Sequence, residues 1–376
     1  MQATPRKLEA LSPSPVCHPD RVEARETVRW DERLRERGGA RELLRIPAFL
    51  FGAVVRARRA GYDSGLLRAH IPPVPVLSVG NLSAGGTGKT PLCIWLAREL
   101  EALGRKPGLV SRGYRGDAQG TNDEAQLFAA ACPRVPQIQD PDRVRAVAEL
   151  ARRGVDAIVL DDGFQHRRLA RSQDWVLVDA LRPWGLPRDE RGDCVRALLP
   201  RGLLREPLSS LERADLLVIT RAGEVPPEWL AQLEAELARA APGKPVVLAA
   251  HRPVQLVDQD GQAHPLAEIA GREVELASAI GNPQAFEASV RALGCRVVAR
   301  HVFPDHHRYS AAEAGELGAR ARASGRPLLV TQKDAVKLAP LRVEFLALEI
   351  AFEIVRGASI ARALLESLPR TDHGNG

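Results

Sequence analysis

The chain has 376 residues, which is enough for two or three domains that each bury a core. Hydrophobic residues make up 45% and charged residues 27%, so a disordered or fibrous chain is excluded. The net charge is +6, but residues 37–68 hold seven arginines against two acidic residues and account for most of it. Basic repeats interleaved with aromatic residues are missing elsewhere, so we expect no nucleic-acid partner.

The five cysteines are scattered along the chain without paired spacing. No zinc site or disulfide framework can be read from them, and their use suits a reducing compartment. The N-terminus lacks the apolar run of a signal peptide. These features predict a cytoplasmic protein.

Residues 1–35 are rich in proline and charge, which predicts a poorly ordered extension. Apolar residues at helical spacing follow, and the uncharged run Ile46 to Val55 has arginines on both sides. Ten residues are too few to span a bilayer, which needs about 20. At about residues 40–60 the pattern predicts either a helix in a membrane interface or an amphipathic helix packed on its own domain.

Short apolar runs then alternate with helical patterns, which predicts an α/β fold with a mostly parallel sheet flanked by helices. A first domain over residues 36–245 would be followed by a second, smaller α/β domain over 246–376. Strands are expected at 76–79, 108–110, 157–160, 175–178 and 216–219, then at 246–249, 274–280, 297–302, 328–331 and 345–352. Helices are expected at 91–103, 143–153, 283–293 and 311–324.

The first strand leads into a glycine-rich loop that ends in Gly88-Lys89-Thr90 and opens a helix. Backbone amides in such a loop can surround phosphate oxygens, the lysine can reach the β- and γ-phosphates, and the hydroxyl can bind Mg²⁺. Only six of the 53 basic residues are lysines, so a lysine in this motif is informative. The general pattern has glycine where Ser83 stands. The predicted ATP-binding residues are Ser83, Ala84, Gly85, Gly86, Thr87, Gly88, Lys89 and Thr90.

A second motif, which is acidic, completes the P-loop NTPase-like pattern begun by the glycine-rich loop. The apolar run 157–160 delivers Asp161 and Asp162 to the carboxyl edge of the sheet, where α/β folds bind ligands. Neighbouring carboxylates are costly unless a cation neutralises them. The predicted metal ligands are therefore Thr90, Asp161 and Asp162, with Mg²⁺ as the metal.

Between about residues 43 and 352 many short motifs follow one another in a specific order. They are Val79-Gly80-Asn81-Leu82, Gly85 to Pro91, Ser111-Arg112-Gly113-Tyr114, Asp123-Glu124, Asp161 to His166, Arg168 to Arg171, Leu204 to Pro207, Gly281-Asn282-Pro283, Phe303 to His307 and Thr331 to Leu338. In their order and number these motifs resemble the tetraacyldisaccharide 4'-kinases of lipid A biosynthesis. The resemblance implies that residues 36–245 form the P-loop kinase core and that the smaller second domain closes the active-site cleft. Family members also have a small hydroxyl residue at the position of Ser83.

The resemblance implies transfer of the ATP γ-phosphate to the 4'-hydroxyl of a tetraacyldisaccharide 1-phosphate, which yields lipid IVA. It implies Lys89 as a catalytic residue and Asp123 as the base, although the family has glycine where Asn122 precedes that aspartate and the loop before it is shortened. A C-terminal histidine would support the base, and His306 and His307 both remain candidates. Residues expected near a phosphate or the substrate are Arg112, Asn81, Gln165 and His166.

A lipid substrate also favours the interfacial helix over the packed one, with an anionic inner-membrane surface as partner. The expected location is peripheral, on the cytoplasmic face of the inner membrane, with no obligate protein partner. The deviant loop also suits a switch-type NTPase that delivers metals or positions membrane complexes. The Asp305-His306-His307 motif and the absence of a Cys-x-x-Cys motif speak against that alternative.

Overall fold

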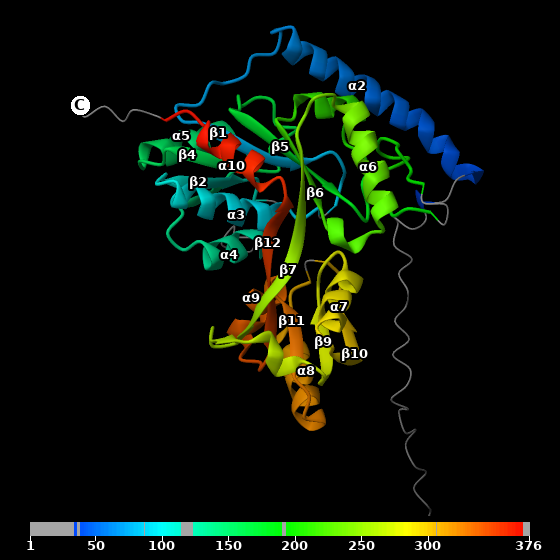
Figure 1. Ribbon diagram of the computed structural model, residues 1–376, viewed down its shortest axis with the longest axis vertical. Helices are drawn as coiled ribbons and strands as arrows, with labels where there is room; N and C mark the ends of the chain where they lie inside the picture. The colour runs from blue at the N-terminus through cyan, green and yellow to red at the C-terminus, as the bar shows by residue number, and fades with distance from the viewer. Residues whose placement is uncertain are drawn as a thin grey trace, which may run out of the picture.

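The computed structural model describes residues 34–35, 38–85, 87–113, 123–189, 193–305 and 307–370. Most of the expected extension over residues 1–35 lies outside the described residues. Within these ranges one 12-stranded sheet runs through the molecule in the order β10-β9-β11-β12-β7-β6-β5-β1-β4-β2-β3, with β8 paired to β7 (Figure 1). Every pairing is parallel except those of β7 with β12 and with β8. The predicted α/β class with a mostly parallel sheet is confirmed.

The expected strands are all present, and several extend further than the sequence indicated. The strands are β1 (Val76–Asn81), β2 (Pro107–Ser111), β3 (Gln137–Gln139), β4 (Ala157–Asp161), β5 (Gln173–Asp179), β6 (Leu216–Thr220), β7 (Val246–Asp258), β8 (Ala263–His264), β9 (Glu273–Ser278), β10 (Arg296–Val302), β11 (Leu328–Thr331) and β12 (Leu346–Arg356). Strands β7 and β12 are longer than expected at their C-terminal ends. The residues there are largely half-exposed or exposed and form no continuous apolar run that would mark them as strand.

The helices cover both faces of the sheet. They are α2 (Arg45–Asp63), α3 (Lys89–Ala102), α4 (Asp123–Ala131), α5 (Arg143–Arg152), α6 (Pro227–Ala240), α7 (Pro283–Ala292), α8 (Ala311–Ser324), α9 (Gln332–Leu338) and α10 (Ala358–Glu366). Helix α8 has the expected bounds because Ser310 and Glu313 form a capping box at its start and Gly325 ends it at φ 65°. No helix in the described ranges combines the length and the hydropathy that crossing a bilayer would require.

Two groups of parallel strands meet at the long β7–β12 pair, and we call residues 38–245 the N-terminal half and 246–370 the C-terminal half. In the N-terminal half, α3, α4 and α10 pack on one face of the sheet, and α5 and α6 on the other. In the C-terminal half, α8 and α9 lie on one face and α7 on the other. Helix α10 returns to the N-terminal half after β12, and Figure 1 shows it beside α3.

The antiparallel β7–β12 pairing decides where a site can form. Strand β7 runs parallel to β6, and β12 runs parallel to β11, so the two parallel groups point in opposite directions. Their carboxyl ends consequently face each other across the junction of the halves. Ligands bind at the carboxyl ends of strands in α/β sheets, so this junction is where the fold places a site.

Candidate active site

The glycine-rich loop connects β1 to α3 in the way the sequence predicted. Gly88 caps the helix with φ 86°, a conformation that suits glycine, and its lack of a side chain leaves the first-turn amides accessible. The Ala84 N–H donates to the Leu203 carbonyl at 2.8 Å, and the Thr220 hydroxyl donates to the Thr87 carbonyl at 3.2 Å. One side of the loop is therefore held by the segment around Leu203 and the other by the end of β6. Gly86 lies outside the described residues.

The Lys89 side chain returns to the carboxyl edge of the sheet. Its Nζ lies 3.4 Å from Asn81 Oδ1 and 3.7 Å from Asp162 Oδ1. Arg205 grips the Asp162 carboxylate with two hydrogen bonds of 2.9 Å and also donates to Asn81. Burial opposes ionisation of Asp162, but the Arg205 hydrogen bonds and the charges of Lys89, Arg205 and Arg143 hold its pKa well below the usual range. Asp162 is thus an ionised carboxylate beside the loop.

Asp161 sits in the opposite environment although it is the adjacent residue. Burial raises the pKa of Asp161 to about 7, and the negative charges of Glu124 and Asp162 act in the same direction. The positive charge of Lys89 opposes this rise. Its Oδ1 atom is buried without a hydrogen-bond partner among the described residues. An unpartnered buried carboxylate oxygen is costly, and a bound cation would offset that cost.

The two carboxylates and Thr90 fit a divalent cation of the Mg²⁺ type. Thr90 is buried in the first turn of α3, on the same edge as Asp161 and Asp162. Three or more His, Cys, Asp or Glu side chains do not gather anywhere in the described part of the chain. Mg²⁺ does not need such a cage, because it usually combines one or two carboxylates with waters and phosphate oxygens.

Asp123 begins α4 and faces the C-terminal half. Its Oδ2 lies 2.8 Å from Lys337 Nζ, while the next residue, Glu124, lies 3.5 Å from Lys333 Nζ. Helices α4 and α9 are in direct contact, so these pairs join the two halves. The sequence placed Asp123 at the site but assigned no role to Lys337.

The histidine candidates are described only in part. His306 lies outside the described residues. The His307 ring stacks on Phe303 with centroids 4.9 Å apart, and its Nε2 lies 3.2 Å from both carboxylate oxygens of Glu313. In this structure His307 is therefore engaged with groups of its own half.

The remaining expected contacts lie on the edge of the N-terminal half. Gln165 donates to the Asn81 carbonyl at 3.0 Å, so it supports the start of the loop. Burial and then the nearby arginines, Arg143 first, lower the pKa of His166 to about 4, which keeps its ring neutral. Arg112 follows β2 and is exposed.

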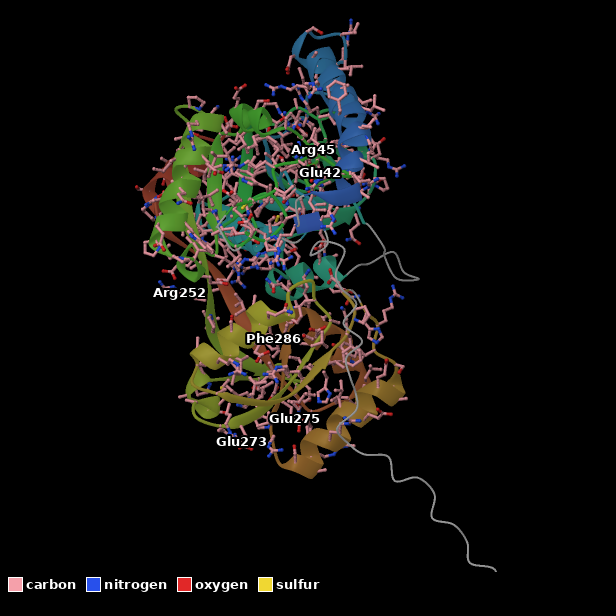
Figure 2. All side chains as sticks on the ribbon, turned by 90° about the vertical axis from the view of Figure 1, so that its right-hand side faces the viewer. Glu42, Arg45, Arg252, Glu273, Glu275 and Phe286 are labelled. Carbon is pink, nitrogen blue, oxygen red and sulfur yellow. The ribbon has the colours of Figure 1, made fainter. Side chains whose placement is uncertain are left out.

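Two cavities lie at the junction of the halves. One, of about 350 Å³, is polar and is lined by the loop, Lys89 and Asp179 from one half and by Asp305 and Lys333 from the other. The second, of about 280 Å³, shares Lys89 but is largely apolar. Its apolar lining includes Leu127, Ile280, Phe286, Leu348 and Ile350. Figure 2 shows Phe286 on the side of the C-terminal half that is nearest the N-terminal half.

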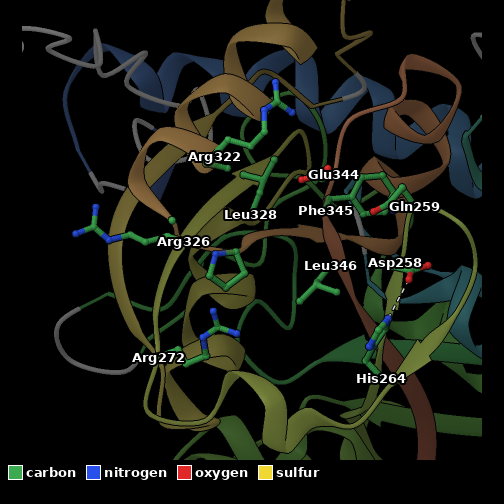
Figure 3. Close-up of a pocket in the computed structure, with 14 residues that line it drawn as sticks. Asp258, Gln259, His264, Arg272, Arg322, Arg326, Leu328, Glu344, Phe345 and Leu346 are labelled. Carbon is green, nitrogen blue, oxygen red and sulfur yellow. Dashed lines mark hydrogen bonds and ion pairs between the residues drawn. The ribbon is translucent and has the colours of Figure 1, made fainter.

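A further cavity, of about 440 Å³, lies in the C-terminal half away from the loop (Figure 3). Its lining includes Asp258, His264, Arg272 and Arg322, and His264 pairs with Asp258 at 2.9 Å. None of the predicted site residues lines this cavity. The junction is therefore the candidate active site.

Comparison with known proteins agrees with this geometry. The family model of tetraacyldisaccharide-1-P 4'-kinase matches residues 40–369. The chain belongs to this family. The tetraacyldisaccharide 4'-kinase of Anaeromyxobacter sp. (strain Fw109-5) is 39% identical over 350 residues, covering 86% of this chain and 90% of that protein. The one from Alkalilimnicola ehrlichii is 40% identical over 323 residues, covering 81% and 87%.

A solved structure supports the same assignment to the tetraacyldisaccharide 4'-kinase family. LpxK from Aquifex aeolicus, crystallised in complex with ATP, is 29% identical and superposes with a TM-score of 0.68. The match covers 87% of this chain and 98% of that chain. The resemblance read from the short motifs is thereby confirmed.

Several site residues of this kinase family member had no role in the sequence analysis. Arg205 was part of a motif, but only the fold shows that it grips Asp162. Arg221 pairs with Asp179 and lines both junction cavities. His251 lies under the loop, because a Cβ added to Gly88 would come within 2.8 Å of its Cε1. No local pattern marks His251, since its position depends on the course of β7.

Proposed function

We propose that this protein transfers the γ-phosphate of ATP to the 4'-hydroxyl of a tetraacyldisaccharide 1-phosphate, a precursor of lipid A. The observation that carries the proposal is the junction itself. There, in a member of the tetraacyldisaccharide 4'-kinase family, a phosphate-binding loop with Lys89 lines both junction cavities together with Glu124. The residue before Glu124 is Asp123, which pairs with Lys337 of the C-terminal half. Phosphoryl transfer requires positioning and charge neutralisation more than covalent chemistry, and this edge offers both.

The nucleotide phosphates would bind to the loop amides and to Lys89. Lys89 is held by two oxygen acceptors, Asn81 and Asp162, and so is already directed at the edge where the phosphates would lie. Thr90, Asp161 and Asp162 would hold Mg²⁺, which supplies neutralisation of the phosphate charge when bound. Arg205 keeps the Asp162 carboxylate ionised and fixed in orientation.

Asp123 would act as the base. A sugar hydroxyl is a weak nucleophile, and a carboxylate that accepts its proton as the new O–P bond forms typically contributes about 10²- to 10⁴-fold. The bond from the γ-phosphate to ADP breaks in the same step. Asp123 is the first residue of α4, and its neighbour Glu124 lines both junction cavities.

Helix α2 would dock the enzyme on the membrane that holds its substrate. It lies across the outside of the N-terminal half, and only Ala48, Gly52 and Gly61 of the helix are buried (Figure 1). Large apolar side chains on and just before the helix are between 61% and 68% exposed: Leu43, Ile46, Phe49, Leu50 and Val54. A helix packed on its own domain would bury these side chains, so their exposure favours the interfacial role.

The charge around α2 suits an anionic surface. Arg45, which is paired with Glu42, and Arg56 flank the exposed apolar residues of the helix. Each arginine near an anionic leaflet is worth about 1 kcal/mol of binding. Arg59 instead donates to Ser209 and pairs with Glu212, which fixes the helix to the body. We therefore propose peripheral binding to the cytoplasmic face of the inner membrane.

One assay tests the reaction. Purified protein is incubated with γ-labelled ATP, Mg²⁺ and tetraacyldisaccharide 1-phosphate, and label is sought in the lipid. We expect labelled lipid from the wild type. ATP hydrolysis without labelled lipid would contradict the proposal and favour a switch-type NTPase.

The role of Asp123 is tested in the same assay. Asp123→Asn keeps the shape of the side chain but removes the base, so turnover should fall about 10²-fold or more. ATP binding, measured by calorimetry, should stay close to that of the wild type. Retained turnover in this variant would remove Asp123 from the role of base and leave the kinase assignment intact.

A further inference from the structure

Lys337 connects the C-terminal half to the proposed base. Its Nζ lies 2.8 Å from Asp123 Oδ2, across the contact between α9 and α4. The Lys337 side chain is only 8% exposed and that of Asp123 only 20%. An ion pair this well shielded is screened much less than the exposed pairs on the surface. Loss of either partner would therefore be felt strongly by the other.

A second carboxylate, that of Asp334, also lies near the Lys337 ammonium group. Asp334 Oδ1 lies 3.9 Å from Lys337 Nζ, and the Asp334 side chain is fully buried. The Thr331 hydroxyl donates to Asp334 at 2.6 Å, and the Tyr309 hydroxyl and the Ala279 N–H each donate at 3.1 Å. These donors come from separate parts of the C-terminal half, so the Asp334 carboxylate is fixed in place beside Lys337. The buried Lys337 Nζ has ionic contacts with Asp123 and Asp334 but no hydrogen bond among the described residues.

We propose that Lys337 is a positioning residue for phosphoryl transfer. Its ammonium group lies against the Asp123 carboxylate and limits the orientations of that side chain, and the buried charge of Asp334 attracts Lys337 in turn. This inference rests on the proposed role of Asp123 as the base. It adds that the C-terminal half supplies part of the arrangement needed for the proton transfer.

The chemistry of an ammonium group suits this role. It has three donors and no acceptor, so it can bind both carboxylates but cannot take the proton of the acceptor hydroxyl. The same contact also keeps α9 against α4. A positioning role must therefore be distinguished from a merely structural clamp between the halves.

The test uses the full-length protein and a set of variants in the lipid-labelling assay. Lys337→Met removes the charge and keeps most of the length, whereas Lys337→Arg keeps a charge. Lys106→Met is the matched control, because Lys106 is an exposed lysine just before the start of β2, at the end of the strand away from the carboxyl edge of the sheet. Turnover, KM for ATP and melting temperature are measured for each variant and for the Asp123→Asn, Lys337→Met double variant.

We expect Lys337→Met to lower kcat about tenfold or more, as part of what a general base contributes, with KM for ATP changed less than about twofold. Lys337→Arg should recover part of the loss, and Lys106→Met should match the wild type. The double variant should be no worse than Asp123→Asn within about threefold, because Lys337 acts only through Asp123. If Lys337 only held the two halves together, the fold-losses in kcat of the two single variants would multiply in the double variant.

Two results would overturn the inference. The first is a Lys337→Met enzyme within twofold of the wild type while Asp123→Asn is impaired. The second is multiplication of the two losses in the double variant. Full activity of Asp123→Asn would instead refute the proposed base itself. If Lys337→Met does not fold, Asp334→Asn serves as the second variant, since it loosens Lys337 without touching Asp123, and its loss should likewise vanish in the Asp123→Asn background.

Discussion

The loop edge of the sheet and the outer surface of α2 belong to the same half but follow opposite physical rules. At the edge, charged groups are paired at short distances, as Arg205 is with Asp162. On α2, large apolar side chains such as Leu50 are exposed although burial would favour them. We propose that the edge carries the chemistry on phosphates and that α2 contacts a membrane surface. Changes at the edge should stop the reaction on any form of substrate, whereas changes on α2 should matter only when the substrate is in a membrane.

The largest expected effect is at Lys89. Lys89→Met removes the cation that neutralises the transferred phosphate, so label transfer should fall by on the order of 10³-fold or more. The loss should be equal for acceptor in detergent and acceptor in anionic vesicles. A loss of label transfer seen only with vesicles would contradict the assignment of Lys89 to the reaction itself.

Asp161→Asn should show opposite effects on activity and stability. Loss of a metal ligand should lower turnover by on the order of 10²- to 10³-fold. The melting temperature without nucleotide should be unchanged or higher, because a buried carboxylate with an unpartnered oxygen is replaced by a neutral group. A clear fall in melting temperature would show that Asp161 has a structural role instead. Thermal unfolding and the labelling assay give both readouts.

The apolar face of α2 should affect activity only on membranes. Replacing Ile46, Leu50 and Val54 by serine removes side chains whose insertion would each contribute about 1 to 2 kcal/mol. Sedimentation with anionic vesicles should fall at least tenfold, with turnover on detergent-dispersed acceptor unchanged. Val254→Ser is the control, since that side chain is 49% exposed in the C-terminal half. Unchanged vesicle binding of the triple variant would refute the docking role of α2.

Sequence reasoning placed the loop and the Asp161-Asp162 pair at one edge of the sheet because both motifs are local. Gly88-Lys89-Thr90 follows a strand directly, and Asp161 ends another, so each position follows from a short stretch of chain. Lys337 and Arg205 were quoted in motifs without a role, because their partners lie far away in the sequence. Their contacts depend on the meeting of α9 with α4 and on the return of the chain to the loop. Packing of distant segments sets these contacts, and no local pattern encodes it.

The smallest expected effect concerns the buried imidazole under the loop. Burial, and then the charge of Arg221, lowers the pKa of His251 to about 4, against about 6.5 in an unfolded chain. The folded state therefore favours neutral His251, and this contribution is complete above pH 6.5 and is lost as the pH falls towards 4. Between pH 7.5 and pH 5 the wild type should lose about 1 to 2 kcal/mol more than His251→Phe, which corresponds to about 2–4 °C in melting temperature. If both proteins lose the same stability between pH 7.5 and pH 5, water must reach the His251 ring. The loop edge would then be more open to solvent than the comparison with α2 assumes.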